Sequence, residues 1–114
     1  LFGDVKGRGA GLIDDMIDTA GTLCAGAKVV KEAGARSVFA AATHGLLSGS
    51  AVERLTESVI EQVVITDTVP LPESAAGSDL FRVLSVDRIL ADSVHNVFCD
   101  ESVSAIFAGE NQLF

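Results

Sequence analysis

Apolar residues fall along the chain in short runs of strand length that alternate with stretches of helical spacing. Strands are predicted at residues 9–13, 37–43, 62–66 and 81–85. Helices are predicted at residues 23–33, 50–58 and 86–98, and Gly34 stands where a helix C-cap favours glycine. The alternation predicts parallel βαβ units, and hence an α/β fold with an open, mostly parallel, doubly wound sheet and helices on both faces.

The first predicted strand is expected to be buried and to end at Asp14. Polar clusters follow three of the strands: Asp14-Asp15, Thr43-His44 and Thr66-Asp67-Thr68. The C-terminal ends of parallel strands share one edge of a sheet, and ligands bind at that edge in open α/β proteins. The clusters therefore predict a ligand site there. A single histidine after a strand is more typical of a structural residue than of a catalyst, so His44 receives no catalytic role.

The composition limits the classes of function. The 114 residues and 11.8 kDa suffice for one domain, and a hydrophobic fraction of 48% supports a core. The net charge of −8 argues against a nucleic-acid surface, and any bound phosphate would need backbone N–H groups or a divalent metal. No run approaches the roughly 18 apolar residues that span a bilayer. Cys24 and Cys99 form no CxxC pair, which favours a reducing cytoplasm.

The segment "DTAGT", residues 18–22, is predicted to be a phosphate-binding loop that leads into a helix. The small residues Ala20 and Gly21 let the backbone come close to a ligand, and the free N–H groups of a first helical turn bind anions. Thr19 and Thr22 add hydroxyl donors.

Two acids precede this loop. Asp14 and Asp15 accept hydrogen bonds when ionised, which suits the vicinal hydroxyls of a sugar or a hydrated magnesium ion. The two acids would bind the hydroxyls of a sugar phosphate, and the loop would bind its phosphate. A turn of Asp, Thr and Gly between a strand and a helix is also common as a simple helix cap, so composition alone leaves both interpretations open.

The order of the whole string "LIDDMIDTAGTL" resembles the phosphoribosyl pyrophosphate signature of the type I phosphoribosyltransferase fold. The blocks "GDVKGR", "KEAGARSVFAAATHGLLSGSAVERL", "VVITDTVPLP", "RVLSV" and "ESVSAIF" accompany it in order. Nearly the whole chain thus resembles the C-terminal half of the ribose-phosphate diphosphokinases, or phosphoribosyl pyrophosphate synthetases. The resemblance implies transfer of diphosphate from ATP to the C1 hydroxyl of ribose 5-phosphate, with Mg²⁺, in homo-oligomers.

The resemblance also implies roles for single residues. It places Asp14 and Asp15 at the ribose hydroxyls, directly or through magnesium. It assigns the 5-phosphate loop of the ribose 5-phosphate site to Asp18, Thr19, Ala20, Gly21 and Thr22. It assigns no catalytic residue and no metal ligand to this chain. Ser102 and Ser104 match a tail that helps to form a regulatory phosphate or nucleotide site between subunits, and the alternative is a tail that only packs on the body.

The chain departs from the family pattern in two ways. Ser50 stands where the family often has proline, which affects one loop. The family's ATP-binding residues, its metal-binding His and Asp and its basic catalytic loop belong to an N-terminal half that does not precede Leu1. We therefore expect one domain over residues 1–114, a fragment of a longer cytoplasmic enzyme and inactive alone. A phosphoribosyltransferase that consumes phosphoribosyl pyrophosphate, or a non-catalytic associated subunit, is the alternative.

Overall fold

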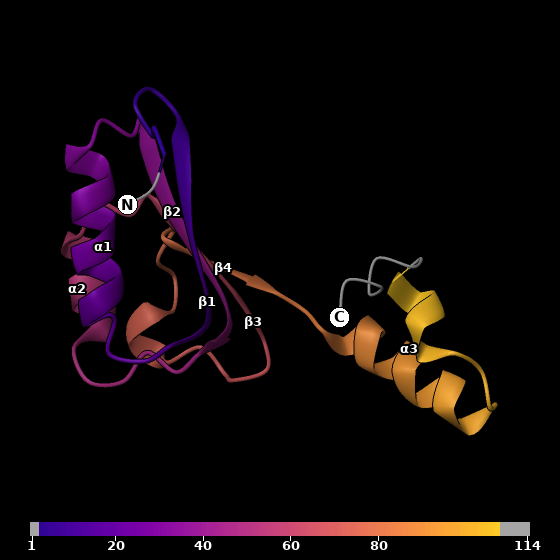
Figure 1. Cartoon of the computed structure of the whole chain (residues 1–114). Coiled ribbons are helices and arrows are strands. Elements are labelled where there is room, and N and C mark those ends of the chain that lie inside the picture. Colours follow the sequence, from indigo (N-terminus) through magenta and orange to yellow (C-terminus); the bar gives the residue numbers. More distant parts are fainter. Residues whose placement is uncertain (1–2, 108–114) are drawn as a thin grey trace. The chain divides into compact units, whose positions relative to one another are not determined.

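The structure, a computed structural model, describes residues 3–107 and divides the chain into two compact units, Leu1–Leu84 and Ser85–Phe114. The first unit contains β1 (Gly9–Ile17), α1 (Gly21–Glu32), β2 (Ser37–Gly45), α2 (Ala51–Glu57), β3 (Gln62–Thr66), the 3₁₀ turn η1 (Glu73–Ala75) and β4 (Phe81–Leu84) (Figure 1). The second contains α3 (Asp87–Phe98) and the 3₁₀ turn η2 (Val103–Phe107). Every predicted strand and helix is therefore present.

The four strands form one sheet in the order β1-β2-β3-β4, and every neighbouring pair is parallel. This confirms the α/β class with an open parallel sheet flanked by helices. Helices α1 and α2 lie side by side on one face of the sheet (Figure 1). Because the strand order runs in one direction, right-handed crossovers place both helices on that same face. A helical layer on the second face stays a prediction.

The core of the first unit lies between the sheet and these two helices. Alternate residues of the central strands point toward the helices, and the helices supply small and branched side chains opposite them. The fully buried side chains include Val38 and Ala40 of β2, Val63 of β3, Ala27 of α1, and Ala51 and Leu55 of α2.

Strand β1 differs from the prediction in two respects. It continues to Ile17 instead of ending at Asp14, so both acids lie within the strand. The prediction of a buried strand is also wrong, since the Ile13 side chain is 73% exposed. The physical reason is that β1 is an edge strand of this sheet, and Ile13 pairs with Ala41 on the face that α1 and α2 do not cover.

The end of α1 confirms the role predicted for Gly34. This glycine has a φ of +99°, and its N–H donates to the Lys31 carbonyl at 3.0 Å. The N–H of Ala35 donates to the Val30 carbonyl at 3.3 Å, which completes a Schellman motif. The left-handed residue turns the chain out of the helix toward β2.

The second unit is built around α3. The N–H of Glu101 donates to the Asn96 carbonyl at 2.7 Å, where the chain leaves the helix. Helix α3 carries exposed apolar residues, among them Leu90, Val94 and Phe98. Among residues 3–107, none of the helices combines the length and the apolar character that crossing a membrane requires.

Candidate functional site

The connection between β1 and α1 has a strained backbone. Ala20 occupies the N-cap position of α1 with φ 62° and ψ 6°, in the left-handed region. For a residue with a Cβ atom this conformation costs about 1–2 kcal/mol. The residue is also buried, at 6% exposure. Strain of this kind is concentrated at ligand sites, where the surrounding structure holds the backbone in place.

The first turn of α1 presents free backbone donors. No side chain caps the helix at Ala20. The first closed turn is the bond from the Cys24 N–H to the Ala20 carbonyl, at 3.0 Å. Within residues 3–107, the N–H groups of Gly21, Thr22 and Leu23 have no hydrogen-bond partner. Such donors and the positive end of the helix dipole attract an anion, whereas a simple cap would have satisfied them.

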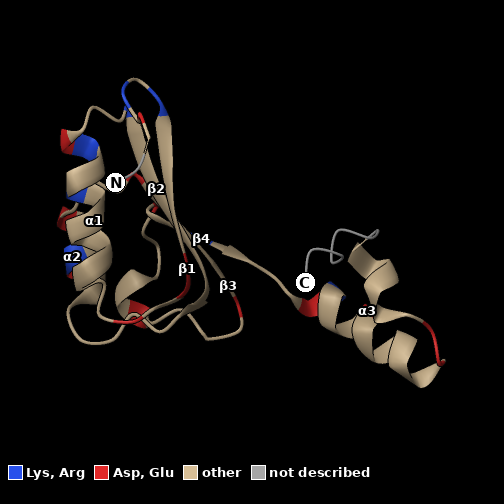
Figure 2. Cartoon of the chain, in the orientation of Figure 1, with Lys and Arg blue, Asp and Glu red and all other residues tan. Residues whose placement is uncertain are grey.

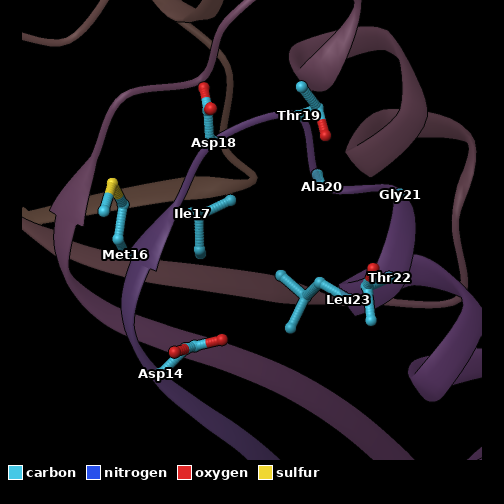
Figure 3. A pocket seen from close by; sticks show the side chains of 9 residues that line it. All are labelled: Asp14, Met16, Ile17, Asp18, Thr19, Ala20, Gly21, Thr22 and Leu23. Carbon is cyan, nitrogen blue, oxygen red and sulfur yellow. The ribbon is translucent and has the colours of Figure 1, made fainter.

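A cavity of about 150 Å³ lies against this turn. Its lining consists of Asp14, Met16, Ile17, Asp18, Thr19, Ala20, Gly21, Thr22 and Leu23 (Figure 3). All predicted sugar-phosphate residues except Asp15 thus meet in one place. Pockets for drug-sized ligands have about 300–1,000 Å³, so this space suits a small group such as a phosphate. Met16, Ile17 and Leu23 were not predicted, because apolar residues carry no signal of ligand binding.

The two acids on β1 have different surroundings. Successive side chains of a strand point to opposite faces, so only one of the pair can face the cavity. Asp14 does so, from the strand side, and Thr22 faces it from the helix side (Figure 3). The Asp15 N–H donates to Oδ1 of Asp14 at 2.8 Å. Asp15 itself lies outside the cavity lining, and a role for it at the sugar hydroxyls stays a prediction.

The other polar clusters form their own network at the ends of β2 and β3. Nδ1 of His44 lies 2.7 Å from Oγ1 of Thr68. Both Thr66 and Thr68 donate through their hydroxyls to the Thr43 carbonyl, at 2.7 and 3.2 Å. His44 is thereby linked to the end of β3, and its structural role stays a prediction. None of these residues lines the cavity beside α1.

Ser102 and Ser104 lie in the second unit. Their hydroxyl oxygens are 2.6 Å apart, and Nδ2 of Asn96 donates to the Ser102 carbonyl at 3.0 Å. Both serines are exposed. The pair could offer hydroxyl groups to a phosphate, and its regulatory role stays a prediction.

The charges near the cavity restrict what it can bind. Asp and Glu lie at the C-terminal ends of the strands, and both acidic and basic residues lie on α1 and α2 (Figure 2). The cavity lining itself contains two carboxylates, Asp14 and Asp18, and no Lys or Arg among residues 3–107, so its anion-attracting groups are the helix N–H groups. Residues 3–107 contain no group of three or more His, Cys, Asp or Glu placed to hold a metal. Asp14 and Asp18 are the carboxylates in the cavity lining, and either would fit Mg²⁺, which usually takes one or two carboxylates together with waters and substrate phosphates.

Arg54 on α2 also contacts the loop, although sequence reasoning did not single it out. Its Nη1 donates to the Thr19 carbonyl at 2.8 Å. The two residues are 35 positions apart, and nothing in the local pattern of α2 distinguishes this arginine from a surface charge. The contact follows only from the packing of α2 beside α1.

Comparisons of the sequence and of the structure with known proteins identify the same group of proteins. A family model described as "Phosphoribosyl synthetase-associated domain" matches residues 1–108. The chain is 49% identical over 107 residues to a ribose-phosphate pyrophosphokinase of Marinomonas sp. (strain MWYL1), covering 94% of the chain and 34% of that protein. A ribose-phosphate pyrophosphokinase of Nostoc sp. is also 49% identical over 107 residues, covering 94% of this chain and 32% of that protein.

A solved structure is also similar. The crystal structure of phosphoribosylpyrophosphate synthetase from Mycobacterium smegmatis matches with a TM-score of 0.81 and 42% identity, over 86% of this chain and 33% of that one. The chain thus spans about a third of the length of these relatives.

Proposed function

The chain belongs to the phosphoribosyl synthetase-associated domain family, and from this premise we propose that it is the ribose 5-phosphate-binding part of a ribose-phosphate diphosphokinase. In this proposal the chain is the C-terminal part of the enzyme and has a type I phosphoribosyltransferase fold. The observation that carries the proposal is the cavity whose lining contains both Asp14 and the first-turn residues Gly21, Thr22 and Leu23, whose N–H groups have no partner within residues 3–107. Donors for a phosphate and an acceptor for sugar hydroxyls then lie at opposite sides of one small space.

The residues of the chain would act by positioning the sugar. The N–H groups of Gly21, Thr22 and Leu23 receive the 5-phosphate, and the hydroxyl of Thr22 adds a donor. Asp14 accepts hydrogen bonds from ribose hydroxyls and so orients the ring. The C1 oxygen is then held toward ATP, from which diphosphate is transferred while AMP leaves. Holding the reactants in this way lowers the entropic part of the barrier.

Mg²⁺ would neutralise charge on the phosphates of ATP, and Asp14 or Asp18 in the cavity lining could hold it. The transferred phosphates also need cationic side chains, because such stabilisation is worth on the order of 10³-fold or more in rate. Residues 3–107 bring no Lys or Arg side chain into the cavity lining. We therefore propose that synthesis requires the further length that the relatives have.

Titration of the isotope-labelled chain with ribose 5-phosphate, inorganic phosphate and ribose tests the proposal by NMR. Amide signals of Gly21, Thr22 and Leu23 should shift with both phosphate compounds, whereas ribose alone should leave them in place. Binding of ribose 5-phosphate should be tighter than that of phosphate, because only the sugar reaches Asp14. Absence of shifts at these amides at millimolar ribose 5-phosphate would refute the proposal.

A synthesis assay separates the proposal from its alternatives. The chain extended to the length of its relatives should make phosphoribosyl pyrophosphate from ATP and ribose 5-phosphate, and the 114-residue chain should not. An extended chain that binds the sugar phosphate without turnover would indicate a non-catalytic subunit. Tighter binding of phosphoribosyl pyrophosphate than of ribose 5-phosphate, together with base-dependent release of diphosphate, would indicate a phosphoribosyltransferase.

A further inference from the structure

Helix α2 reaches the proposed phosphate loop through one side chain. Nη1 of Arg54 donates to the Thr19 carbonyl at 2.8 Å, although the arginine itself is exposed. The backbone carbonyl of the same residue accepts a weak hydrogen bond from Sγ of Cys24, at 3.7 Å. Arg54 therefore contacts both the loop and the first turn of α1.

The bond to Thr19 determines the direction of a neighbouring donor. The peptide between Thr19 and Ala20 is trans, as are all the peptide bonds of the described residues. In a planar trans peptide the carbonyl and the N–H point to opposite sides. With the Thr19 oxygen turned toward Arg54, the Ala20 N–H points away from α2, and Ala20 belongs to the cavity lining.

The same peptide precedes the strained residue. Ala20 is held at φ 62°, which an alanine leaves readily if nothing opposes it. A rotation of this peptide would move both the Thr19 oxygen and the Ala20 N–H, and would turn a carbonyl toward the space where an anion would bind. A hydrogen bond from a guanidinium to the carbonyl opposes that rotation, and bonds to charged groups are stronger than neutral ones.

We propose that Arg54 is a positioning residue for the phosphate loop, which holds the Thr19–Ala20 peptide so that its N–H, and not its oxygen, faces the bound phosphate. The inference rests on the proposed function, since it concerns the same cavity. It differs from direct attraction of phosphate by the arginine charge, because the effect passes through the backbone conformation at Ala20. This difference can be measured.

The test is a double-mutant cycle on the 114-residue chain, with ribose 5-phosphate and inorganic phosphate as the ligands in calorimetry. Arg54→Gln should weaken the binding of both ligands by at least about tenfold. Lys28→Gln removes a positive charge from the exposed side of α1 and is the matched control for net charge, with an expected change of less than about twofold. Ala20→Gly introduced into the Arg54→Gln chain should restore part of the lost affinity, because glycine adopts the left-handed conformation without strain.

The possible results distinguish the two proposals. If the wild-type chain binds both ligands and the Arg54→Gln variant binds them with the same affinity, the positioning role is overturned and the proposed function stays intact. A loss that Ala20→Gly does not reduce would also overturn it, in favour of direct charge attraction or a general disturbance of α2. Absence of wild-type binding would overturn the proposed function and this inference with it. If Arg54→Gln fails to fold, Arg54→Lys serves in the same cycle, with a smaller loss that Ala20→Gly should again reduce.

Discussion

Replacement of each β1 acid by asparagine tests the geometry of the proposed sugar site directly. Asp14 lines the cavity, whereas the next residue, Asp15, does not. Both substitutions remove one negative charge from neighbouring positions, so they change the field at the phosphate by similar amounts. Any difference between the two variants therefore reports on contact with the ligand.

The expected magnitudes follow from the contacts. A hydrogen bond to a charged group contributes about 1.5–3 kcal/mol, and the lower end applies here because Asp14 is exposed. Asp14→Asn should thus weaken ribose 5-phosphate binding by about tenfold. Asparagine keeps an oxygen that can accept the 2.8 Å bond from the Asp15 N–H, so the strand itself should not change. Asp15→Asn is a surface substitution, for which changes within about 0.5 kcal/mol, roughly twofold, are usual.

Calorimetry at one fixed ionic strength measures both affinities, with inorganic phosphate as a second ligand. Because Asp14 is proposed to contact the sugar and not the phosphate, Asp14→Asn should leave phosphate binding within about twofold of wild type. Equal losses for the two variants, or a larger loss for Asp15→Asn, would contradict the orientation of the β1 side chains. An equal loss of affinity for phosphate would show that the substitution disturbs the loop itself, because removal of a negative charge should favour an anion.

Other substitutions test the loop, the helix and the thiol. Thr22→Val should lower ribose 5-phosphate affinity about tenfold in calorimetry, while Thr56→Val, whose hydroxyl bonds within α2, should not. Urea denaturation should show that Gly34→Ala lowers the free energy of unfolding by about 1–2 kcal/mol, because φ is +99° at Gly34. In the same assay Gly26→Ala, in the open interior of α1, should raise the free energy of unfolding by about 0.5–1 kcal/mol. Burial raises the pKa of the Cys24 thiol, so its alkylation, followed by mass spectrometry, should accelerate at a higher pH than the alkylation of free cysteine. Acceleration at the same pH as free cysteine, or at a lower pH, would be inconsistent with this burial.

The order of the elements was predictable because the relevant signals are local. β3 has the predicted bounds, and the other strands and helices differ from the predictions by a few residues at their ends. Gly34 marked the end of α1 because only a left-handed residue closes a Schellman motif without strain. That Asp14 and residues 18–22 line one cavity was also predictable, since they lie within one short segment, and phosphate binding there stays a prediction.

What the sequence did not indicate depends on neighbours in space. Ile13 has the pattern of a buried strand residue, and its 73% exposure follows from its place on an edge strand, on the face that α1 and α2 do not cover. The one-directional strand order, which places α1 and α2 on the same face, is likewise a property of strand pairing and not of periodicity. The left-handed backbone at Ala20 was not expected, because alanine avoids this region unless tertiary contacts hold it there.

Ala20 and Arg54 together explain why a short signature is not sufficient for the proposed site. The segment supplies most of the donors, but the direction of the Ala20 N–H depends on the peptide that Arg54 holds from α2, 35 positions away from Thr19. A chain with an intact "DTAGT" loop and a displaced α2 would keep the motif and lose the donor geometry. Conversely, glycine in place of Ala20 would reduce the dependence on the arginine, because the left-handed conformation would no longer be strained. The identity of the small residue before Gly21 and the presence of a donor on α2 should therefore be considered together when the loop is used to infer sugar-phosphate binding.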